Sequence, residues 1–318
     1  MKVLLWQTAF LGDVVLSTPL ILTLRANLPK AELAFVGRPF IQELFKGWDI
    51  ELIPFSKGLL ESFRIKERIK SFDIAIVPHR SLRSALIVFF SRIPQRIGFD
   101  SSEFKWAFTD LVPHRWELHE VDRNLKLLEP LGVQEFVRNT YLPLSEEEVH
   151  VCLNNLGLKE KEYVVVNPFS NFPLKEWKLS NWAKLITKLV DSGLEVVVTG
   201  LKSDASKMQS LLSEIKVRDL VGRTSIRELM ALIKGSKLVV SNDSSPVHIA
   251  NALGVPAFTI YTATSSRYGF YPLSGGFLDN PAVCSPCSPN PKRCRTRTFE
   301  CLSLPPPELV FEALQKFL

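Results

Sequence analysis

Short apolar runs alternate with longer amphipathic stretches along the whole chain. Short runs of β-branched and other apolar residues predict buried parallel strands, and apolar residues spaced three and four apart predict helices. The predicted strands are Lys2–Trp6, Leu33–Gly37, Glu51–Pro54, Asp73–Pro78, Tyr163–Asn167, Glu195–Thr199, Lys237–Ser241 and Ala257–Tyr261. The predicted helices are Val14–Asn27, Pro39–Lys46, Leu59–Lys70, Leu82–Ser91, Val121–Leu131, Leu179–Asp191, Ser203–Ile215, Ser225–Lys234 and Pro246–Leu253.

This alternation predicts βαβ units and an α/β fold with two Rossmann-like, doubly wound domains. The length of 318 residues also favours two domains. Gly132, Pro143 and the acidic run 146–148 mark the boundary, so we expect domains over residues 1–148 and 149–318. The segment from about 305 to 318 starts with three prolines and is expected to form a last helix, which could pack back on the first domain.

The composition is that of an ordinary globular protein, with 46% hydrophobic and 23% charged residues. No apolar run approaches the ~18–20 residues that a membrane-spanning helix needs. The start of the chain lacks the pattern of a signal peptide, because Asp13 interrupts a short apolar run. These features favour a cytoplasmic enzyme.

The formal net charge of +6 is compatible with an anionic substrate or an anionic membrane surface, although a solvated surface explains it equally well. A nucleic-acid partner is not expected, because the chain has no dense Lys/Arg tract and no basic segment interleaved with aromatic residues.

Three loops after predicted strands hold polar residues, and open parallel sheets bind ligands at the carboxyl ends of their strands. In the first loop, Gly12 permits a tight turn and a close approach of substrate, and Asp13 follows it. Asp13 is a candidate general base, and the alternative is a helix N-cap. The GxGxxG pattern of dinucleotide-binding loops is absent here.

The second loop offers donors for a phosphate or diphosphate: Ser170, Asn171 and Lys175. An ordinary turn with an exposed lysine is the alternative. The third loop contains Asp243, Ser244 and Ser245 before a helix opened by Pro246, with His248 one turn later. A helix N-terminus with nearby hydroxyl groups suits an anion, and the alternative is a capped helix with a half-buried histidine.

Four of the five cysteines are close in sequence, at Cys284, Cys287, Cys294 and Cys301. The C-x2-C-x6-C-x6-C spacing is compatible with a structural zinc ion, but only the first pair has the spacing of a zinc knuckle. Zinc ligation, disulfides and reduced thiols all remain open.

Five segments, in order, resemble the lipopolysaccharide heptosyltransferases of glycosyltransferase family 9. They are Leu11–Leu20, Arg96–Phe99, His119–Leu125, Asn167–Trp182 and the signature from Val221–Ser225 through Asn242–His248. The resemblance spans nearly the whole chain. It implies a GT-B fold with two Rossmann-like domains facing a cleft, the acceptor on the first domain and ADP-heptose on the second. The cysteine-rich tail is similar to that of the second-heptose branch, which favours type II.

By position in the family motifs, Asp13 is expected to be the catalytic base, and Lys175 is expected to stabilise the leaving diphosphate. The other donor contacts that the resemblance implies are Ser170, Asn171, Thr224, Asp243, Ser244, Ser245 and His248. Asp204 stands near the place of a family glutamate that binds ribose. The acceptor side would involve Gly12, with Arg80, Arg83 and Arg123 holding anionic groups.

The resemblance implies an inverting transfer of heptose to Kdo2-lipid A or heptosyl-Kdo2-lipid A, with no required metal cofactor and a peripheral place on the cytoplasmic face of the inner membrane. Ser244-Ser245 replaces the Thr-Gly that is common in the family. That departure leaves room for another GT-B enzyme, such as a different glycan transferase or a sugar-nucleotide epimerase. A nucleotide-sensing or nucleic-acid-binding protein is the alternative from another class.

Overall fold

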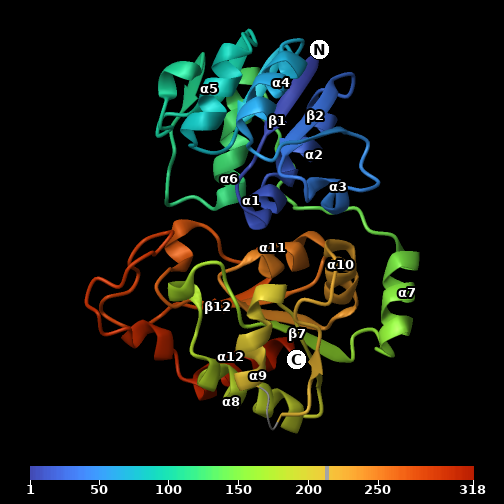
Figure 1. Cartoon of the computed structure of the whole chain (residues 1–318), viewed down its shortest axis with the longest axis vertical. Helices are drawn as coiled ribbons and strands as arrows, with labels where there is room; N and C mark the ends of the chain where they lie inside the picture. Colours follow the sequence, from blue (N-terminus) through green and yellow to red (C-terminus); the bar gives the residue numbers. More distant parts are fainter. Residues whose placement is uncertain (212–214) are drawn as a thin grey trace. The chain divides into compact units, whose positions relative to one another are not determined.

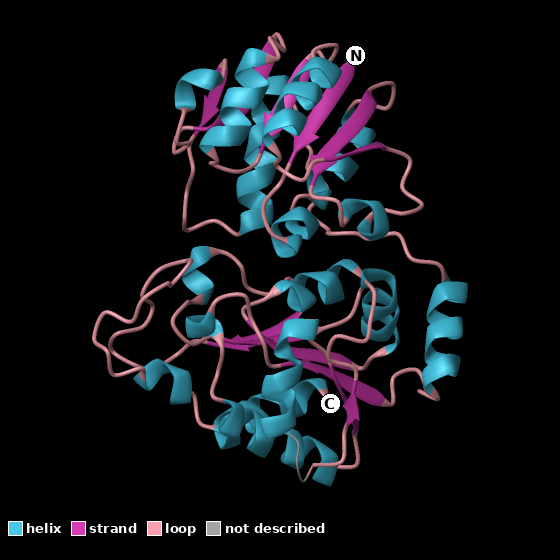
Figure 2. Ribbon diagram, in the orientation of Figure 1, coloured by secondary structure: helices cyan, strands magenta, loops and turns pink. Residues whose placement is uncertain are grey.

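The computed structural model describes residues 1–211 and 215–318 and divides into two compact units, Met1–Pro143 and Leu144–Leu318. Each unit contains one sheet of six strands, accompanied by helices (Figures 1 and 2). The expected boundary at residue 148 therefore falls inside helix α7 (Glu146–Leu156), which belongs to the second unit.

The sheet of the N-terminal unit has the order β3-β2-β1-β4-β5-β6, and all neighbouring strands are parallel. Its strands are β1 (Lys2–Trp6), β2 (Glu32–Gly37), β3 (Glu51–Pro54), β4 (Ile74–Val77), β5 (Gln95–Phe99) and β6 (Asp110–Val112). Its helices are α1 (Leu11–Leu16), α2 (Thr18–Asn27), α3 (Ile41–Leu44), α4 (Leu59–Ile69), α5 (Leu82–Phe90) and α6 (Glu120–Leu125). The direction of winding reverses between β1 and β4.

The sheet of the C-terminal unit has the order β12-β11-β10-β7-β8-β9 and is also parallel throughout. Its strands are β7 (Tyr163–Asn167), β8 (Glu195–Val198), β9 (Arg218–Asp219), β10 (Leu238–Asn242), β11 (Ala257–Ile260) and β12 (Gly275–Leu278). Its helices are α7, α8 (Leu179–Asp191), α9 (Ala205–Leu211), α10 (Ile226–Gly235), α11 (Ser245–Ala252) and α12 (Pro307–Leu314). Here the winding reverses between β7 and β10.

Continuous apolar strands form the centre of each unit. All residues of β4 and β7 are buried, as expected for parallel strands covered on both faces. In the C-terminal unit, α8 adds Trp182 to the core, and its ring packs edge-on against Trp177 with centroids 5.3 Å apart. These buried strands fix the loops at their carboxyl ends, where the candidate site residues lie.

Several elements differ from the sequence-based expectation. Strands β5, β6, β9 and β12 were not predicted, and neither was α7, although Ser145 and Glu148 form a capping box at its start. The single helix expected over Val14–Asn27 is two helices, α1 and α2, that meet at Ser17. The expected helix Ser203–Ile215 corresponds to a 3-10 turn (Lys202–Asp204) and α9, and residues 212–214 of that prediction lie outside the described residues.

The last helix, α12, packs against α8 within the C-terminal unit (Figure 1). Val310 and Leu314 are fully buried in the core of that unit. The apolar face of α12 is therefore used within its own unit, and packing of this helix on the first domain stays a prediction. Among the described residues, no helix is long and apolar enough to cross a membrane.

Candidate functional site

Asp13 lies in the first turn of α1, just beyond the carboxyl end of β1. Its Oδ2 accepts a hydrogen bond from the backbone N–H of Phe10 at 3.1 Å, and its side chain is partly exposed. Asp13 thus satisfies one N–H group at the helix start, and it also places a carboxylate at the point where the winding of the sheet reverses. Gly12, expected to form a tight turn, is instead a buried residue of α1.

Two arginines flank Trp116 near this edge. The guanidinium carbons of Arg80 and Arg123 lie 5.2 and 5.0 Å from the ring centroid. Arg80 is exposed, but Arg123 is only 1% exposed and donates a hydrogen bond to the carbonyl oxygen of Leu118 at 3.0 Å. Arg123 is thus held by contacts within its own unit, and its expected contact with an acceptor stays a prediction.

Glu120 is a buried carboxyl group beside Arg123, with its Oε2 3.4 Å from Arg123 Nε. Burial raises the pKa of Glu120 above its usual range, Arg123 opposes that rise, and the negative charge of Asp13 adds to it. Glu120, Arg123 and Asp13 are therefore close enough to influence one another electrostatically, although sequence analysis did not single out Glu120.

Further basic residues lie after β2 and β3 of the N-terminal sheet. Arg38 directly follows β2, and Lys57 lies a few residues after β3. Arg83, at the start of α5, donates a hydrogen bond to the backbone carbonyl of Lys57 at 2.6 Å. Burial, followed by the charges of Arg38 and Arg83, lowers the pKa of Lys57. Arg38 and Lys57 were not predicted, although their places just after apolar strands are a usable sequence signal.

In the C-terminal unit, Lys175 and Asp243 meet at the point where the winding reverses. Lys175 Nζ donates to Asp243 Oδ2 at 2.7 Å, and the two side chains are only 12% and 10% exposed. Lys175 comes from the loop after β7 and Asp243 from the loop after β10. The structure thus joins two predicted site residues that are far apart in the sequence.

The remaining residues of the third loop begin α11. Ser244 is the N-cap residue and Ser245 the first residue of the helix, and both are half-buried. The hydroxyl groups of Ser244 and Ser241 are hydrogen-bonded at 3.0 Å. His248 is buried within the helix. The start of α11 therefore stands beside the Lys175–Asp243 pair, and unpaired N–H groups at a helix start favour anions.

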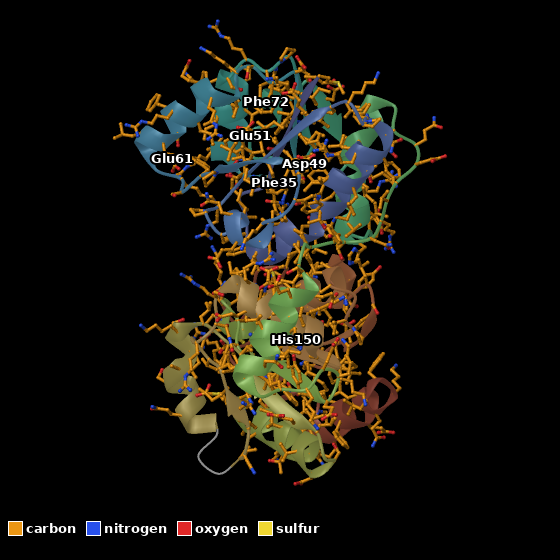
Figure 3. All side chains as sticks on the ribbon, turned by 90° about the vertical axis from the view of Figure 1, so that its right-hand side faces the viewer. Phe35, Asp49, Glu51, Glu61, Phe72 and His150 are labelled. Atoms are coloured by element: carbon orange, nitrogen blue, oxygen red, sulfur yellow. The ribbon has the colours of Figure 1, made fainter. Side chains whose placement is uncertain are left out.

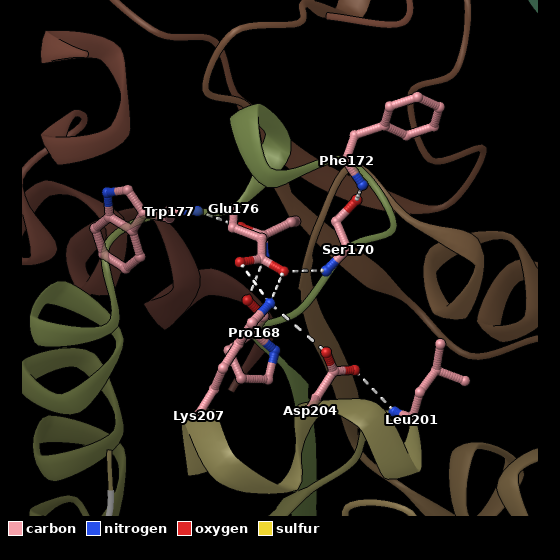
Figure 4. A network of polar contacts seen from close by, with 9 residues as sticks. Pro168, Ser170, Phe172, Glu176, Trp177, Leu201, Asp204 and Lys207 are labelled. Carbon is pink, nitrogen blue, oxygen red and sulfur yellow. Dashed lines mark hydrogen bonds and ion pairs between the residues drawn. The ribbon is translucent and has the colours of Figure 1, made fainter. Parts of the chain in front are cut away.

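The other expected donor contacts are arranged differently (Figure 4). The backbone N–H of Ser170 donates to Glu176 Oε1 at 3.0 Å, and the Ser170 hydroxyl accepts from the N–H of Phe172 at 3.3 Å. Asp204 is buried, and its Oδ2 accepts from the N–H of Leu201 at 3.0 Å. The carboxylate of Asp204 is therefore committed to a turn, and a ribose contact through it stays a prediction.

Asn171 is exposed, and Thr224 is half-buried directly before Ser225, the N-cap of α10. Their donor contacts also stay predictions. Sequence analysis missed Glu176 and Lys207, whose side chains connect these loops, with Lys207 Nζ 2.7 Å from Glu176 Oε1. The two lie far apart in the sequence, so their pairing is visible only in the fold.

All five cysteines are free thiols in the structure. Cys301 is buried in an apolar cluster that includes Leu174, the residue before Lys175 in the sequence. Cys284, Cys287 and Cys294 pack against the same cluster. Burial and the neighbouring thiols raise the pKa of Cys301 to about 11. Within the described residues, no group of three or more His, Cys, Asp or Glu side chains is arranged to hold a metal ion. The four thiols therefore share one apolar cluster, and whether they bind zinc, form disulfides or stay reduced remains a prediction.

A pocket of about 590 Å³ opens at the opposite, amino-terminal edge of the N-terminal sheet, lined in part by Asp49 and Glu51 (labelled in Figure 3). Its charges are paired with one another, in Lys2–Glu32, Arg25–Asp49 and Arg68–Glu51. Because it lies away from the carboxyl ends of the strands and its charges are satisfied, we assign it no role in the site.

Known proteins are similar to this chain in sequence and in fold. The chain is 28% identical to lipopolysaccharide heptosyltransferase 2 of Escherichia coli K12 over 296 residues, 84% of each chain. It is 31% identical to lipopolysaccharide heptosyltransferase 3 of the same strain over 279 residues, 80% of each chain. The solved structure of E. coli ADP-heptose LPS heptosyltransferase II has the same GT-B fold, with a TM-score of 0.81, 22% identity and coverage of 100% of this chain and 98% of that one.

The family model of glycosyltransferase family 9 (heptosyltransferase) matches residues 62–299, which include the polar loops of the C-terminal unit and most of the cysteine cluster. The full-length likeness in fold agrees with the two parallel sheets. The chain therefore belongs to glycosyltransferase family 9 and is a glycosyltransferase.

Proposed function

We propose that this enzyme transfers heptose from ADP-heptose to the inner core of lipid A-linked lipopolysaccharide. The observation that carries the donor side is the Lys175–Asp243 pair, 2.7 Å apart at the start of α11, where the sheet reverses its winding. A cation and a helix N-terminus at such a point suit the diphosphate of a sugar nucleotide. The names of the relatives agree with this donor and product class.

The chemistry that we propose is a single displacement. Asp13 accepts the proton of an acceptor hydroxyl group, and the oxygen bonds to the anomeric carbon as the bond from that carbon to ADP breaks. Attack from the face opposite ADP inverts the configuration at that carbon. Lys175 and the N-terminus of α11 stabilise the negative charge that collects on the departing diphosphate. Protein cations and dipoles can do this without a required metal ion.

On the acceptor side, the exposed cations Arg38, Arg80 and Arg83 support binding of an anionic glycolipid. We propose Kdo2-lipid A or its mono-heptosylated form as acceptor, which would place the enzyme peripherally on the cytoplasmic face of the inner membrane. The net charge of +6 favours such a surface. Type II activity, on the mono-heptosylated form, agrees with the name of one relative.

A transfer assay tests this function directly. ADP-heptose is offered with Kdo2-lipid A and, separately, with heptosyl-Kdo2-lipid A, and products are identified by mass. Transfer to the mono-heptosylated acceptor alone is the expected result. Transfer only to another glycan, or epimerisation of a sugar nucleotide without transfer, would replace this function with another GT-B activity. Salt-dependent retention on DNA, combined with no ADP binding, would indicate the nucleic-acid-binding alternative.

The cysteine cluster calls for a separate measurement. If the four thiols of the cluster are reduced, the purified protein should carry no stoichiometric zinc and should show four reactive thiols after denaturation, besides Cys152. Elemental analysis and thiol titration check this. About one zinc per chain, lost together with stability on chelation, would instead establish the structural zinc site that the spacing permits.

A further inference from the structure

Three consecutive residues at the donor side are each held by a partner from elsewhere in the unit. Lys175 Nζ donates to Asp243 at 2.7 Å. The next residue, Glu176, accepts from Lys207 Nζ at 2.7 and 3.0 Å with its two carboxylate oxygens. The backbone N–H of Trp177 donates to Asn242 Oδ1 at 3.0 Å. Lys175 and the two residues that follow it are thus each in contact with a different segment of the C-terminal unit.

Lys207 is the centre of the network drawn in Figure 4. From α9, it bridges the Glu176 carboxylate to that of Asp204, whose Oδ1 lies 3.6 Å away. Glu176 in turn accepts from the N–H of Ser170 at 3.0 Å, which closes the loop from Ser170 to Glu176. Lys207 thus ties the segment after β8 to the loop after β7.

The ammonium group of Lys207 balances the negative charges of two carboxylates, those of Glu176 and Asp204. The side chains of Glu176 and Asp204 are only 15% and 11% exposed, and both face the same ammonium group. Without that group, two poorly solvated carboxylates would stand close together. A charge left unpaired in such a place is costly, so Glu176 would turn toward solvent and release the Ser170 N–H.

We propose that Lys207 is a positioning residue for the donor site, which through Glu176 holds the segment 170–177 so that Lys175 points at Asp243. This inference rests on the proposed function in that Lys175 is taken to bind the donor diphosphate. Lys207 itself need not touch the donor. Because Lys207 acts by ordering the segment 170–177, its removal should change the dynamics of that segment in the enzyme without bound donor.

The first experiment measures amide hydrogen exchange of the segment 168–178 in the full-length enzyme without ligand. In Lys207→Met, we expect faster exchange at Ser170 and Trp177, whose N–H groups donate to Glu176 and Asn242. Lys207→Arg should restore protection, because a guanidinium group can also pair with a carboxylate. Lys202→Met, which removes an exposed lysine from the turn before α9, is the matched control and should leave exchange unchanged.

The second experiment measures ADP affinity of the same variants by calorimetry, with melting temperatures as the check on folding. We expect about tenfold weaker binding in Lys207→Met, the scale of one charge-assisted hydrogen bond, and near-normal binding in Lys207→Arg and Lys202→Met. Unchanged exchange in Lys207→Met, or faster exchange with unchanged ADP affinity, would overturn the proposal. If the unaltered enzyme binds no ADP, the proposed donor is wrong, and the exchange data still decide whether Lys207 orders the loop.

Discussion

Asp13 has two roles that one substitution separates. As a residue of the first turn of α1, it accepts a hydrogen bond from Phe10 N–H, and the amide oxygen of asparagine can do the same. As a general base it must take up a proton, which asparagine cannot do. Asp13→Asn should therefore lower the turnover rate by roughly 10²–10⁴, with the melting temperature and ADP affinity nearly unchanged. Initial rates at saturating donor and acceptor check this, and near-normal turnover would show that another group takes the proton.

Lys175 is paired in the structure with Asp243, so its removal acts on ADP in two ways. Lys175→Met deletes a cation that we expect to contact the diphosphate, and it leaves the poorly exposed Asp243 carboxylate unbalanced. ADP binding should weaken by about 1.5–3 kcal/mol, the scale of a hydrogen bond to a charged group. Calorimetry checks the loss. The double variant with Asp243→Asn should bind better than Lys175→Met, because the unbalanced charge is gone, and a still weaker double variant would contradict this account.

The residues of the site were predictable to different degrees. Asp13, Lys175 and Asp243 lie in the segments that follow apolar strands, so their places at the carboxyl edges of the two sheets could be inferred from the sequence. The burial of Arg123 under Trp116 could not be inferred, since the sequence shows a charged residue but not what covers it. The Glu176–Lys207 pair was also hidden, because the two residues are brought together only by the parallel pairing of β7 with β8.

At the level of the element, the continuity of the apolar run decided which strands could be predicted. Central strands such as β7 are continuous apolar runs and were found with correct bounds. The missed strands are short or contain polar residues and glycine, as in β5 (Gln95–Phe99) and β12 (Gly275–Leu278). In β12, a Cβ atom on Gly275 would lie 1.9 Å from the carbonyl oxygen of Ala257, so glycine permits pairing with β11 although it weakens the strand signal.

The last helix offers a test of where its apolar face is used. Leu314 is fully buried in the core of the C-terminal unit, whereas Leu309 on the same helix is 45% exposed. Leu314→Ala should lower the free energy of unfolding by about 2–5 kcal/mol, as buried leucines do, and Leu309→Ala should change it by less than about 0.5 kcal/mol. Denaturant unfolding followed by fluorescence measures both. Equal effects of the two substitutions would mean that α12 does not dock on α8 as described.

On the scale of the whole molecule, the two units have the same topology, and each contains some of the expected site residues. The expected base, Asp13, belongs to the N-terminal unit, and the expected donor residues, Lys175 and Asp243, belong to the C-terminal unit. The segment that ends at Pro143 stays with the first unit, since Tyr141 N–H donates to Thr18 Oγ1 at 3.1 Å and Val137 N–H to Thr23 Oγ1 at 3.0 Å. The boundary therefore lies before Ser145, and α7 begins the second unit.

This arrangement predicts that the C-terminal unit folds and binds ADP without the N-terminal unit, provided that the fragment begins before α7. A fragment of residues 144–318 should fold and bind ADP within about threefold of the full chain, because every residue that we expect to contact ADP lies within it. A fragment of residues 149–318 lacks Ser145, which caps α7, and Glu148, which accepts from Arg227 Nε at 3.0 Å.

Loss of the cap and of this ion pair should cost the shorter fragment about 1–3 kcal/mol and several degrees in melting temperature. Circular dichroism and calorimetry on the two fragments measure these differences. A folded 144–318 fragment that does not bind ADP would show that the N-terminal unit supplies essential contacts to the nucleotide, and equal melting temperatures of the two fragments would place the boundary beyond the first turn of α7.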